Sequence, residues 1–458
     1  MIICIQGLGY VGSAMGVAIG LAKNKFKKKN LKIIGVEKPT AKGKQIISNI
    51  NKGIFPFRSN DIELKYALKI IKRKGLIEAT SSTSIYKKAD IILVSVNCDL
   101  IRSRGNVKVD LTKFKKCVVQ FAEKIKENTL IIIESTIPPG TCKEIVYPTI
   151  KKIFLKRKLN PNKVYIAHSY ERVTPGKNYL SSVINNYRVY SGINRKSEIK
   201  CKNFLSKIIN VKKYPLYKLK NTNSSELSKL MENSYRAVNI ALVDEWSRLA
   251  EKINVDLFDV IKAIKKRPTH NNLKDPGFGV GGYCLTKDPL MAMAGAKQIF
   301  NINQNFQFSK LAVKTNNVMP LSTINVIKKF YSNNLRGIKI LLFGVTYKED
   351  IDDTRYSPSE FFFRKVKYLG AKIQVHDPLA KYWDEVKINI SNKISDIKKF
   401  DVVVFAVKHK EYQKINFRKW KKKKRNFLII DANNILTKNQ LQIIKKKKFK
   451  LISIGKGA

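Results

Sequence analysis

The segment after the first apolar run constrains the fold of this chain most. Met1 to Gln6 is expected to form a short strand, Gly7-Leu8-Gly9-Tyr10-Val11-Gly12 follows it, and an apolar helix is expected to about Ala22. A strand, G-x-G-x-x-G and a helix in this order are the context of a dinucleotide fingerprint. Its first glycine makes the turn, its second admits the pyrophosphate, and its third lets helix and strand pack closely. The pattern predicts a Rossmann-like βαβ unit with phosphates at the helix N-terminus.

An acidic residue follows the second expected strand of this unit. The strand covers Leu31 to Val36, and Glu37 comes 25 residues after Gly12. A carboxylate at this place accepts hydrogen bonds from the ribose hydroxyls of NAD and repels the 2′-phosphate of NADP. Lys38 comes next and works against a strict preference for NAD. The alternative is a glycine-rich packing turn that binds no ligand.

The 458 residues are enough for two or three domains, and apolar patterning divides them into α/β, helical and α/β parts. β-rich apolar runs alternate with amphipathic stretches in the first part, which predicts a parallel sheet with crossover helices. A helical period follows, and Asn223 with Glu226 resembles a capping pair at its start. The second α/β part begins near Gly337 and lacks the three-glycine fingerprint. The expected strands lie at Ile91–Val96, Leu130–Ile133, Val164–Ala167, Tyr187–Tyr190, Ile338–Phe343, Lys372–Val375, Val402–Val407 and Phe427–Ile430, and the long helix at Asn223–Ile253.

The net charge of +56 raises the possibility of nucleic-acid binding. The lysines are spread along the whole chain, however, and no recognisable nucleic-acid module accompanies them. Composition therefore argues against specific nucleic-acid binding and favours a basic, solvated surface that attracts anionic nucleotides.

Cysteine and histidine usage gives no metal site. Six scattered cysteines without a C-x-x-C pair, and four histidines, indicate neither zinc nor a disulfide framework. No apolar run approaches the ~18 residues of a membrane span, and Met1 leads straight into a strand without a basic leader. A soluble protein of the reducing cytoplasm is expected.

A second glycine-rich segment carries a cysteine. Four glycines fall within six positions of Pro276-Gly277-Phe278-Gly279-Val280-Gly281-Gly282-Tyr283-Cys284, so the backbone can approach a ligand closely. On the long helix, Lys229 and Asn233 are four residues apart and project from one face. Together they form a donor pair suited to an oxyanion that develops beside a thiol. The alternative for the pair is a solvated helix face, and for Cys284 an inert buried thiol.

Six motifs in order resemble the UDP-glucose/GDP-mannose dehydrogenase family, whose members are nucleotide-sugar 6-dehydrogenases. The resemblance implies an α/β protein with two Rossmann-like domains joined by a central helical dimerisation region: an NAD-binding domain at 1–205, the central region at 206–325, and a nucleotide-sugar-binding domain at 326–458. It also implies NAD as cofactor and a homodimer through the central helix. The motifs are Gly7 to Gly12, Glu134-Ser135-Thr136-Ile137-Pro138-Pro139-Gly140-Thr141, Tyr170-Glu171-Arg172-Val173-Thr174-Pro175-Gly176, Lys229-Leu230-Met231-Glu232-Asn233, Gly281 to Cys284, and Gly344-Val345-Thr346-Tyr347-Lys348 with Asp352 to Pro358.

The same resemblance implies a mechanism. Cys284 attacks the C6 aldehyde, a second hydride transfer makes a thioester, and water hydrolyses it. Lys229 and Asn233 match the residues that stabilise the oxyanions, Asp288 matches an acid that assists through water, and Glu171 matches the general base. Thr136 matches a residue that orders the water near the nicotinamide. The implied cofactor residues are Gly7, Gly9, Tyr10, Val11, Gly12, Glu37, Val96 and Thr136.

Two segments are similar to enzymes that oxidise UDP-N-acetylhexosamines. These are Glu171-Arg172 with Pro175-Gly176, and the helix run from Glu232 to Ala241, whose arginine contacts the substrate in that subgroup. A cation at Lys274, Lys348 or Arg355 suits a pyrophosphate. The implied substrate residues are Glu171, Arg172, Lys229, Asn233, Arg236, Lys274, Gly281, Lys348 and Arg355.

Four positions depart from the subgroup. Tyr170 stands for an expected proline, Tyr283 for a histidine, His270 for an arginine, and Val96-Asn97-Cys98-Asp99 for a Val-Pro-Thr-Pro turn. None removes a group that the oxidation needs, but together they indicate a divergent branch.

The resemblance thus implies NAD-dependent four-electron oxidation of a nucleotide-sugar, first of all a UDP-N-acetylhexosamine, at C6 to a uronic acid for polysaccharide precursor synthesis. UDP-glucose and GDP-mannose remain alternative substrates. A two-electron hydroxyacid-type dehydrogenase, which needs no thiol, and a polyanion-binding protein remain alternatives of other classes.

Overall fold

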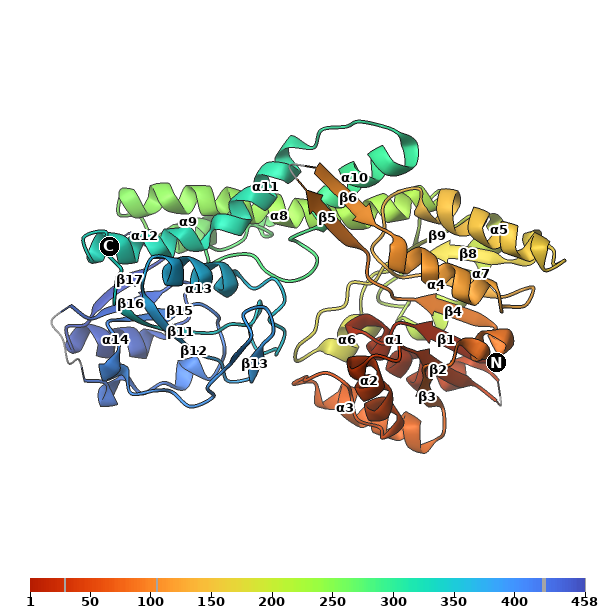
Figure 1. The fold of residues 1–458 in the computed structure, drawn as a ribbon, viewed down its shortest axis with the longest axis horizontal. Coiled ribbons are helices and arrows are strands. Elements are labelled where there is room, and N and C mark those ends of the chain that lie inside the picture. The colour runs from red at the N-terminus through yellow and green to blue at the C-terminus, as the bar shows by residue number, and fades with distance from the viewer. Residues whose placement is uncertain (29, 104–105, 422–425, 458) are drawn as a thin grey trace. The chain divides into compact units, whose positions relative to one another are not determined.

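The computed structural model describes residues 1–28, 30–103, 106–421 and 426–457. These form two compact units, one of Met1–Glu232 with Leu290–Asn305 and one of Asn233–Pro289 with Phe306–Ala458. Each unit contains a Rossmann-like sheet with helices, which confirms the predicted α/β class (Figure 1). The three-part division at 1–205, 206–325 and 326–458 stays a prediction.

The first unit is built on an eight-stranded sheet of order β10-β9-β8-β7-β4-β1-β2-β3. The six neighbouring strands β8, β7, β4, β1, β2 and β3 pair in parallel, so their carboxyl ends share one edge of the sheet. That edge is where ligands bind in open α/β sheets. The strands are β1 (Ile2–Gln6), β2 (Lys32–Val36), β3 (Ile77–Thr80), β4 (Ile91–Val94), β7 (Leu130–Ile133), β8 (Tyr165–His168), β9 (Val189–Gly192) and β10 (Tyr217–Lys218).

The expectation that all strands of this sheet are parallel is wrong at one point. β8 and β9 pair antiparallel, with Ala167 opposite Gly192 and His168 opposite Ser191. The connection between His168 and Val189 holds only the six-residue helix α6 (Tyr179–Ile184) in place of a full-length crossover helix. Glu171 and Arg172 belong to this connection, in the part directly after β8, and therefore lie at the edge of the sheet.

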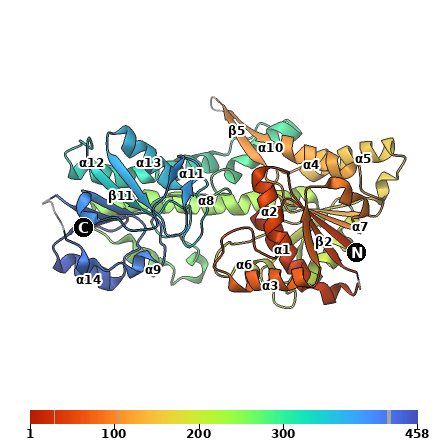
Figure 2. The same cartoon turned by 60° about the horizontal axis from the view of Figure 1, so that its bottom comes forward.

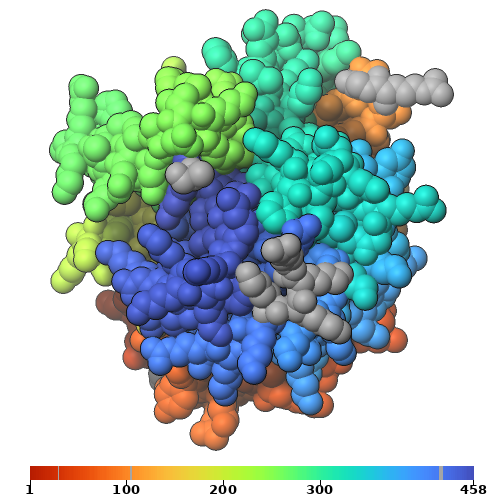
Figure 3. Space-filling model, turned by 90° about the vertical axis from the view of Figure 1, so that its left-hand side faces the viewer, coloured from red at the N-terminus to blue at the C-terminus, as the bar shows by residue number. Residues whose placement is uncertain are grey.

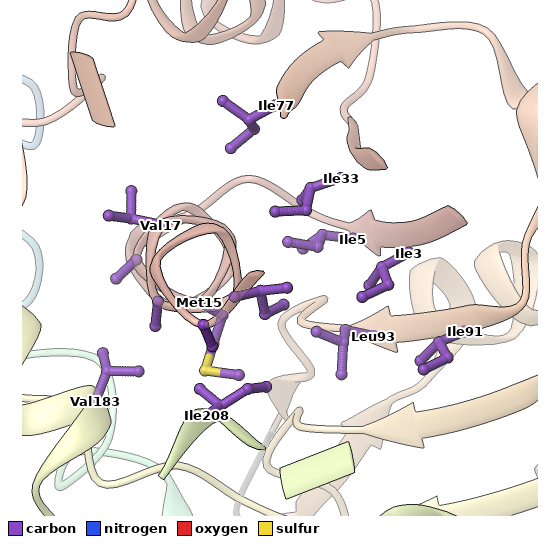
Figure 4. Packing of buried hydrophobic residues seen from close by; sticks show 14 of the residues in the cluster. Ile3, Ile5, Met15, Val17, Ile33, Ile77, Ile91, Leu93, Val183 and Ile208 are labelled. Atoms are coloured by element: carbon purple, nitrogen blue, oxygen red, sulfur yellow. The ribbon is translucent and has the colours of Figure 1, made fainter. Parts of the chain in front are cut away.

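Helices cover both faces of this sheet, and α1 (Tyr10–Leu21) packs directly on it (Figures 1 and 2). Figure 4 shows α1 end-on, with Ile5 and Ile33 of β1 and β2 to one side of the helix, Met15 directed toward Ile208, and Val17 on the side away from the strands. α1 is buried on nearly every side because apolar residues and glycines occupy almost all of its positions. The other helices are α2 (Ala41–Asn51), α3 (Ile62–Arg73), α4 (Thr112–Ala122), α5 (Tyr147–Lys156), α7 (Arg195–Ile208) and α10 (Asp288–Phe300), and a hairpin is formed by β5 (Asp99–Ser103) and β6 (Asn106–Asp110).

The second unit contains a five-stranded parallel sheet of order β12-β11-β15-β16-β17. Alternate residues of β11, β15, β16 and β17 enter one of two apolar clusters, one on each face, as the period of two requires. The elements are β11 (Lys339–Phe343), β12 (Lys372–His376), β15 (Val402–Phe405), β16 (Leu428–Asp431), β17 (Lys450–Ser453), a small pair β13 (Tyr382–Trp383) and β14 (Ile388–Asn389), and helices α9 (Leu257–Ile264), α11 (Gln307–Val318), α12 (Pro320–Phe330), α13 (Pro358–Tyr368) and α14 (Lys438–Lys446).

The long helix is α8 (Thr222–Lys252), of 31 residues, close to the predicted Asn223–Ile253. The predicted cap is wrong: Asn221 is the N-cap, because its Oδ1 accepts from the Ser224 backbone N–H at 2.9 Å. Asn223 lies inside the first turn. The C-terminal part of the chain packs beside the segment after α8, where the Leu257 N–H donates to the Gly455 carbonyl at 3.0 Å (Figure 3).

None of the helices among the described residues is both long enough and apolar enough to cross a bilayer.

Candidate active site

The fingerprint glycines of the first unit have three different roles. Gly7 has φ +92°, a conformation that glycine adopts without strain, and its N–H donates to the Val36 carbonyl at 3.0 Å. Gly9 is the N-cap of α1, and a Cβ there would meet no atom within 4 Å. A Cβ at Gly12 would overlap the Gly7 carbonyl oxygen. Gly7 thus provides the tight turn, Gly9 the open approach for a pyrophosphate, and Gly12 the close packing of helix on strand, as a dinucleotide site requires.

The N-terminus of α1 fits an anion. The N-cap of α1 is Gly9, which has no side chain to cap the first turn, and a helix N-terminus attracts an anion such as a pyrophosphate. Glu37 lies beside the same loop, because its Oε2 accepts from the Leu8 N–H at 2.7 Å. A carboxylate at this place can also bind a ribose hydroxyl. These residues fit NAD.

The remaining predicted cofactor residues follow the carboxyl ends of neighbouring strands. Val96 comes two residues after β4, and its Cγ2 lies 3.6 Å from the Cβ position at Gly7. Thr136 comes three residues after β7 and is half-buried. Tyr10 stacks on Phe57 with ring centroids 4.2 Å apart, and Val11 is half-buried next to it. The first unit therefore gathers the predicted cofactor residues at one edge of its sheet.

The first unit also holds part of the predicted catalytic set. The Lys229 ammonium is buried and donates to the Glu171 backbone carbonyl at 3.0 Å. The Arg172 guanidinium binds Glu232 through Nε and Nη2, at 3.0 and 2.9 Å to Oε2. The Glu171 carboxylate accepts from the Val173 N–H. α8 and the loop after β8 thus bring Lys229 together with Glu171 and Arg172.

Sequence analysis missed the role of Glu226, which it treated as part of a cap. The Glu226 carboxylate is buried and accepts from the N–H groups of Gly140 at 2.7 Å and Cys142 at 2.9 Å. Burial raises the pKa of this carboxyl to about 7. The contact ties α8 to the Pro-Pro-Gly turn that follows Thr136. Residues more than 80 positions apart carry it, so only the fold reveals it.

The second unit places a buried polar group directly after the cysteine. The Cys284 carbonyl accepts from the Asp288 N–H at 2.9 Å, and Cys284 itself is exposed while the other five cysteines are buried. The Asp288 carboxylate is fully buried and accepts from Asn233 Nδ2 at 2.8 Å and from Lys287 Nζ at 2.7 Å. A buried carboxylate of this kind needs such partners. Asn233 and Asp288, predicted separately, are therefore in direct contact.

Lys287 is a second residue that sequence analysis missed. Its ammonium pairs with Asp288 and lies 4.4 Å from the ring centroid of Tyr283. The signal was the Lys-Asp pair after the thiol, in which only the aspartate was assigned a role.

The glycines before Cys284 are pressed against the second α/β motif. A Cβ at Gly281 would lie 2.6 Å from the Tyr356 carbonyl oxygen, and one at Gly282 would lie 2.7 Å from the Tyr347 ring. Gly282 also has φ +84°. Residues Gly281 to Cys284, called the thiol loop below, therefore lie against the segment that follows β11.

The other predicted substrate residues are spread over the second unit. Arg355 is held by Asp353 through two bonds of 2.8 and 2.6 Å, and its Cζ lies 5.9 Å from the Tyr283 ring centroid. The Lys274 N–H donates to Asn239 on α8 at 2.9 Å. Lys348 is half-buried, and Arg236 and His270 are exposed. Only Arg355 and Gly281 are placed at the thiol loop by these contacts.

Beneath Lys348 lies a buried polar network. Asp377 Oδ2 accepts from the Val345 N–H at 2.9 Å and lies 3.2 Å from His409 Nε2. Burial alone would raise the pKa of Asp377, but the hydrogen bond and charge of His409, with those of backbone N–H groups, hold it below its usual value. The network fixes the turn from Gly344 to Lys348 on the sheet edge.

No group of three or more His, Cys, Asp or Glu side chains in the described part of the chain is arranged to hold a metal ion.

Comparison with known proteins gives the family. Residues 1–210 match the NAD binding domain of the UDP-glucose/GDP-mannose dehydrogenase family, residues 223–318 its central domain, and residues 341–438 its UDP binding domain. The UDP-N-acetyl-D-mannosamine dehydrogenase of Methanocaldococcus jannaschii is 31% identical over 99% of this chain and 96% of its own length. That of Methanococcus vannielii is 32% identical over 100% and 97%.

A solved structure has the same fold throughout. The UDP-N-acetyl-D-mannosamine (UDP-D-ManNAc) dehydrogenase of Pyrococcus horikoshii is 25% identical, with a TM-score of 0.83 over all of both chains. With the three family domains in order along its length, the chain belongs to the UDP-glucose/GDP-mannose dehydrogenase family and is an NAD-dependent nucleotide-sugar 6-dehydrogenase.

Proposed function

We propose that this enzyme oxidises C6 of a UDP-N-acetylhexosamine, first of all UDP-N-acetyl-D-mannosamine, to the uronic acid through a covalent intermediate on Cys284. The observation that carries the proposal is the exposed Cys284 thiol at the turn that buries Asp288 with Asn233 and Lys287. The relatives named above, which are UDP-N-acetyl-D-mannosamine dehydrogenases, support this sugar.

The first oxidation converts the C6 alcohol to an aldehyde. The hydroxyl passes its proton to a water molecule, and C6 loses a hydride. NAD, when bound at the glycine loop, supplies the hydride acceptor. The Cys284 thiolate then adds to C6: a C–S bond forms and the carbonyl electron pair moves to oxygen. Lys229 and Asn233, one helical turn apart on α8, are the donors proposed for this oxyanion.

The second oxidation makes the thioester and hydrolysis releases it. A second NAD, when bound, would supply the hydride acceptor; as C6 of the thiohemiacetal loses its hydride, the alkoxide electrons restore the carbonyl. Water then attacks C6, Glu171 takes its proton, and the C–S bond breaks with the electron pair returning to sulfur. Asp288 is proposed to assist proton transfer through water, and Thr136 to order the attacking water. Arg172, Arg236, Lys274, Lys348 and Arg355 are proposed to bind the substrate, as cations suited to its pyrophosphate.

The stoichiometry of NADH tests this proposal. Purified enzyme with NAD receives limiting UDP-N-acetylmannosamine, UDP-N-acetylglucosamine, UDP-glucose or GDP-mannose. We expect two NADH per sugar with UDP-N-acetylmannosamine, and loss of uronic acid formation in Cys284→Ser. Cys117→Ala is the matched control, because Cys117 is buried on α4 and should leave the ratio unchanged. One NADH per sugar, or normal uronic acid from Cys284→Ser, would contradict the proposal. Two NADH with another sugar would correct only the substrate.

We further infer that the enzyme is a homodimer through α8. Large apolar side chains recur along one face of this helix at intervals of three, four and seven residues, which places them in a single stripe. Met231 is 70% exposed and Trp246 55%. Exposed apolar stripes of this size mark association sites, and a helix face that meets its own copy satisfies two-fold symmetry. The stripe consists of Leu227, Met231, Tyr235, Leu242, Trp246, Leu249 and Ile253.

The product suggests a use. A nucleotide-linked uronic acid is an activated acidic sugar, so we infer that the enzyme supplies precursors for polysaccharide synthesis, in the cytoplasm as the cysteine usage predicts.

A further inference from the structure

Tyr170, where the resemblance predicts proline, is a buried aromatic residue beside Lys229. It follows β8 by two residues and is 1% exposed. Lys229 Nζ lies 5.3 Å from the centroid of its ring and donates to the carbonyl of the next residue, Glu171, at 3.0 Å. The ring and the carbonyl thus fix the same ammonium.

The hydroxyl of Tyr170 ties the ring to its neighbours. It lies 2.9 Å from Ser228 Oγ on α8, and Arg172 Nη2 donates to it at 3.2 Å. The Arg172 Cζ is itself 5.3 Å from the ring centroid, and Glu232 holds the guanidinium in place. Lys229 and Arg172 therefore both contact the Tyr170 ring. The backbone after β8 holds one end of this ring, and the hydrogen bonds of its hydroxyl hold the other.

The chemistry of the ring suits this position. The face of an aromatic ring carries negative charge and attracts an ammonium within about 6 Å, more strongly when water is excluded. An ammonium has three N–H donors, so fixing it by a carbonyl and a ring sets the direction of the others. Proline offers no such face.

We propose that Tyr170 is a positioning residue that holds the Lys229 ammonium in the orientation needed to stabilise the oxyanion. This inference rests on the proposed role of Lys229. It assigns the ring, not the hydroxyl, to Lys229, and it assigns the hydroxyl to Ser228 and Arg172.

A double-mutant cycle tests it, using Tyr170→Leu, Lys229→Met and the double variant in the full-length enzyme. We expect Tyr170→Leu to lower kcat about tenfold, within the range that a cation–π contact supplies, with KM for NAD unchanged. In the Lys229→Met background the same change should alter kcat less than about twofold, because the partner is gone. Tyr170→Phe, which keeps the ring, should retain kcat within about threefold.

Control variants distinguish a positioning role of the Tyr170 ring from a general loss of packing. Tyr165→Leu removes a ring of the same unit that lies 4.5 Å from Lys200, and should leave kcat unchanged. If Tyr170→Leu costs the same factor in both backgrounds, or if Tyr170→Phe is as slow as Tyr170→Leu, the inference is overturned.

Stability distinguishes failure of the inference from failure of the proposed function. If the wild-type enzyme oxidises none of the four sugars, the proposed function fails, and the four proteins of the cycle are compared by urea unfolding. Non-additive midpoints would then support the contact between Tyr170 and Lys229, and additive midpoints would overturn it.

Discussion

Gly12 and Gly282 show two reasons for a glycine at the single-residue scale. Gly12 is needed because a side chain would overlap the Gly7 carbonyl oxygen in the cofactor turn. Gly282, two residues before Cys284, has φ +84°, and a Cβ there would lie 2.7 Å from the Tyr347 ring. Gly282 therefore decides where Cys284 lies.

A methyl group at this position should be costly for catalysis. We expect Gly282→Ala to lower kcat at least about tenfold, because misplacing a reacting group by about 1 Å can cost roughly 100-fold. Gly337→Ala is the matched control: Gly337 has φ +78°, so the backbone strain is similar, but a Cβ there meets nothing within 4 Å. Steady-state kinetics of both variants decide it. Equal activity in the two would refute the role assigned to the Tyr347 contact.

Local residue patterns could be predicted from the sequence, and long-range side-chain contacts could not. The Gly7 turn and the following helix depend on neighbours in the chain, so spacing alone revealed them. The partners of Glu226 and Tyr170 lie more than 50 residues away, and no local pattern encodes them. Lys287 was missed because the resemblance assigned a role only to its neighbour.

Individual strands were predictable, but their directions were less so. β7 and β11 were found within one residue, because buried parallel strands are continuous apolar runs. β9 was predicted two residues too early, at Tyr187–Tyr190, and an apolar run does not specify direction, so its antiparallel pairing with β8 was missed. β3 was not predicted, since its exposed Glu78 interrupts a four-residue strand.

Helix α8 is about 46 Å long at 1.5 Å per residue, and its apolar stripe can be tested as an element. We expect the double change Leu242→Glu and Trp246→Glu to convert a dimer to a monomer, since charges would be buried in the interface. Sedimentation equilibrium measures this. Ile62→Glu is the control, because Ile62 is 80% exposed on α3 and should leave the dimer intact. A wild-type monomer, or a dimer that survives the double change, would contradict the assignment.

At the scale of the whole molecule, charge is the dominant property. Lys and Arg number 90 against 34 Asp and Glu, which gives +56 at pH 7. Lys113 with Asp99, Lys126 with Asp90, and Lys143 with Glu144 are ion pairs between two exposed side chains, and such pairs contribute little each. The excess cations repel one another in the folded state.

Salt should therefore stabilise this protein. Raising NaCl from about 20 to 200 mM shortens the Debye length from roughly 20 to 7 Å, and we expect the midpoint of the first thermal transition to rise by about 3 °C, or about 1 kcal/mol. Choline chloride at the same ionic strength should give the same rise, because screening does not depend on the cation. A midpoint that falls or stays constant would show that self-repulsion is not significant.

The burial of five cysteines has a consequence for the fate of the enzyme under oxidative stress. Burial raises the pKa of Cys4 and Cys117 to about 12, so these thiols are hardly ever thiolates in the folded chain. Cys284 alone is exposed among the six. A peroxide or an alkylating agent thus reaches Cys284, the sulfur that we propose to react with the substrate, before the other five. Modification of Cys284 should therefore abolish turnover while the chain stays folded. The amount of alkylating agent needed to abolish turnover should equal the amount of active enzyme in a preparation.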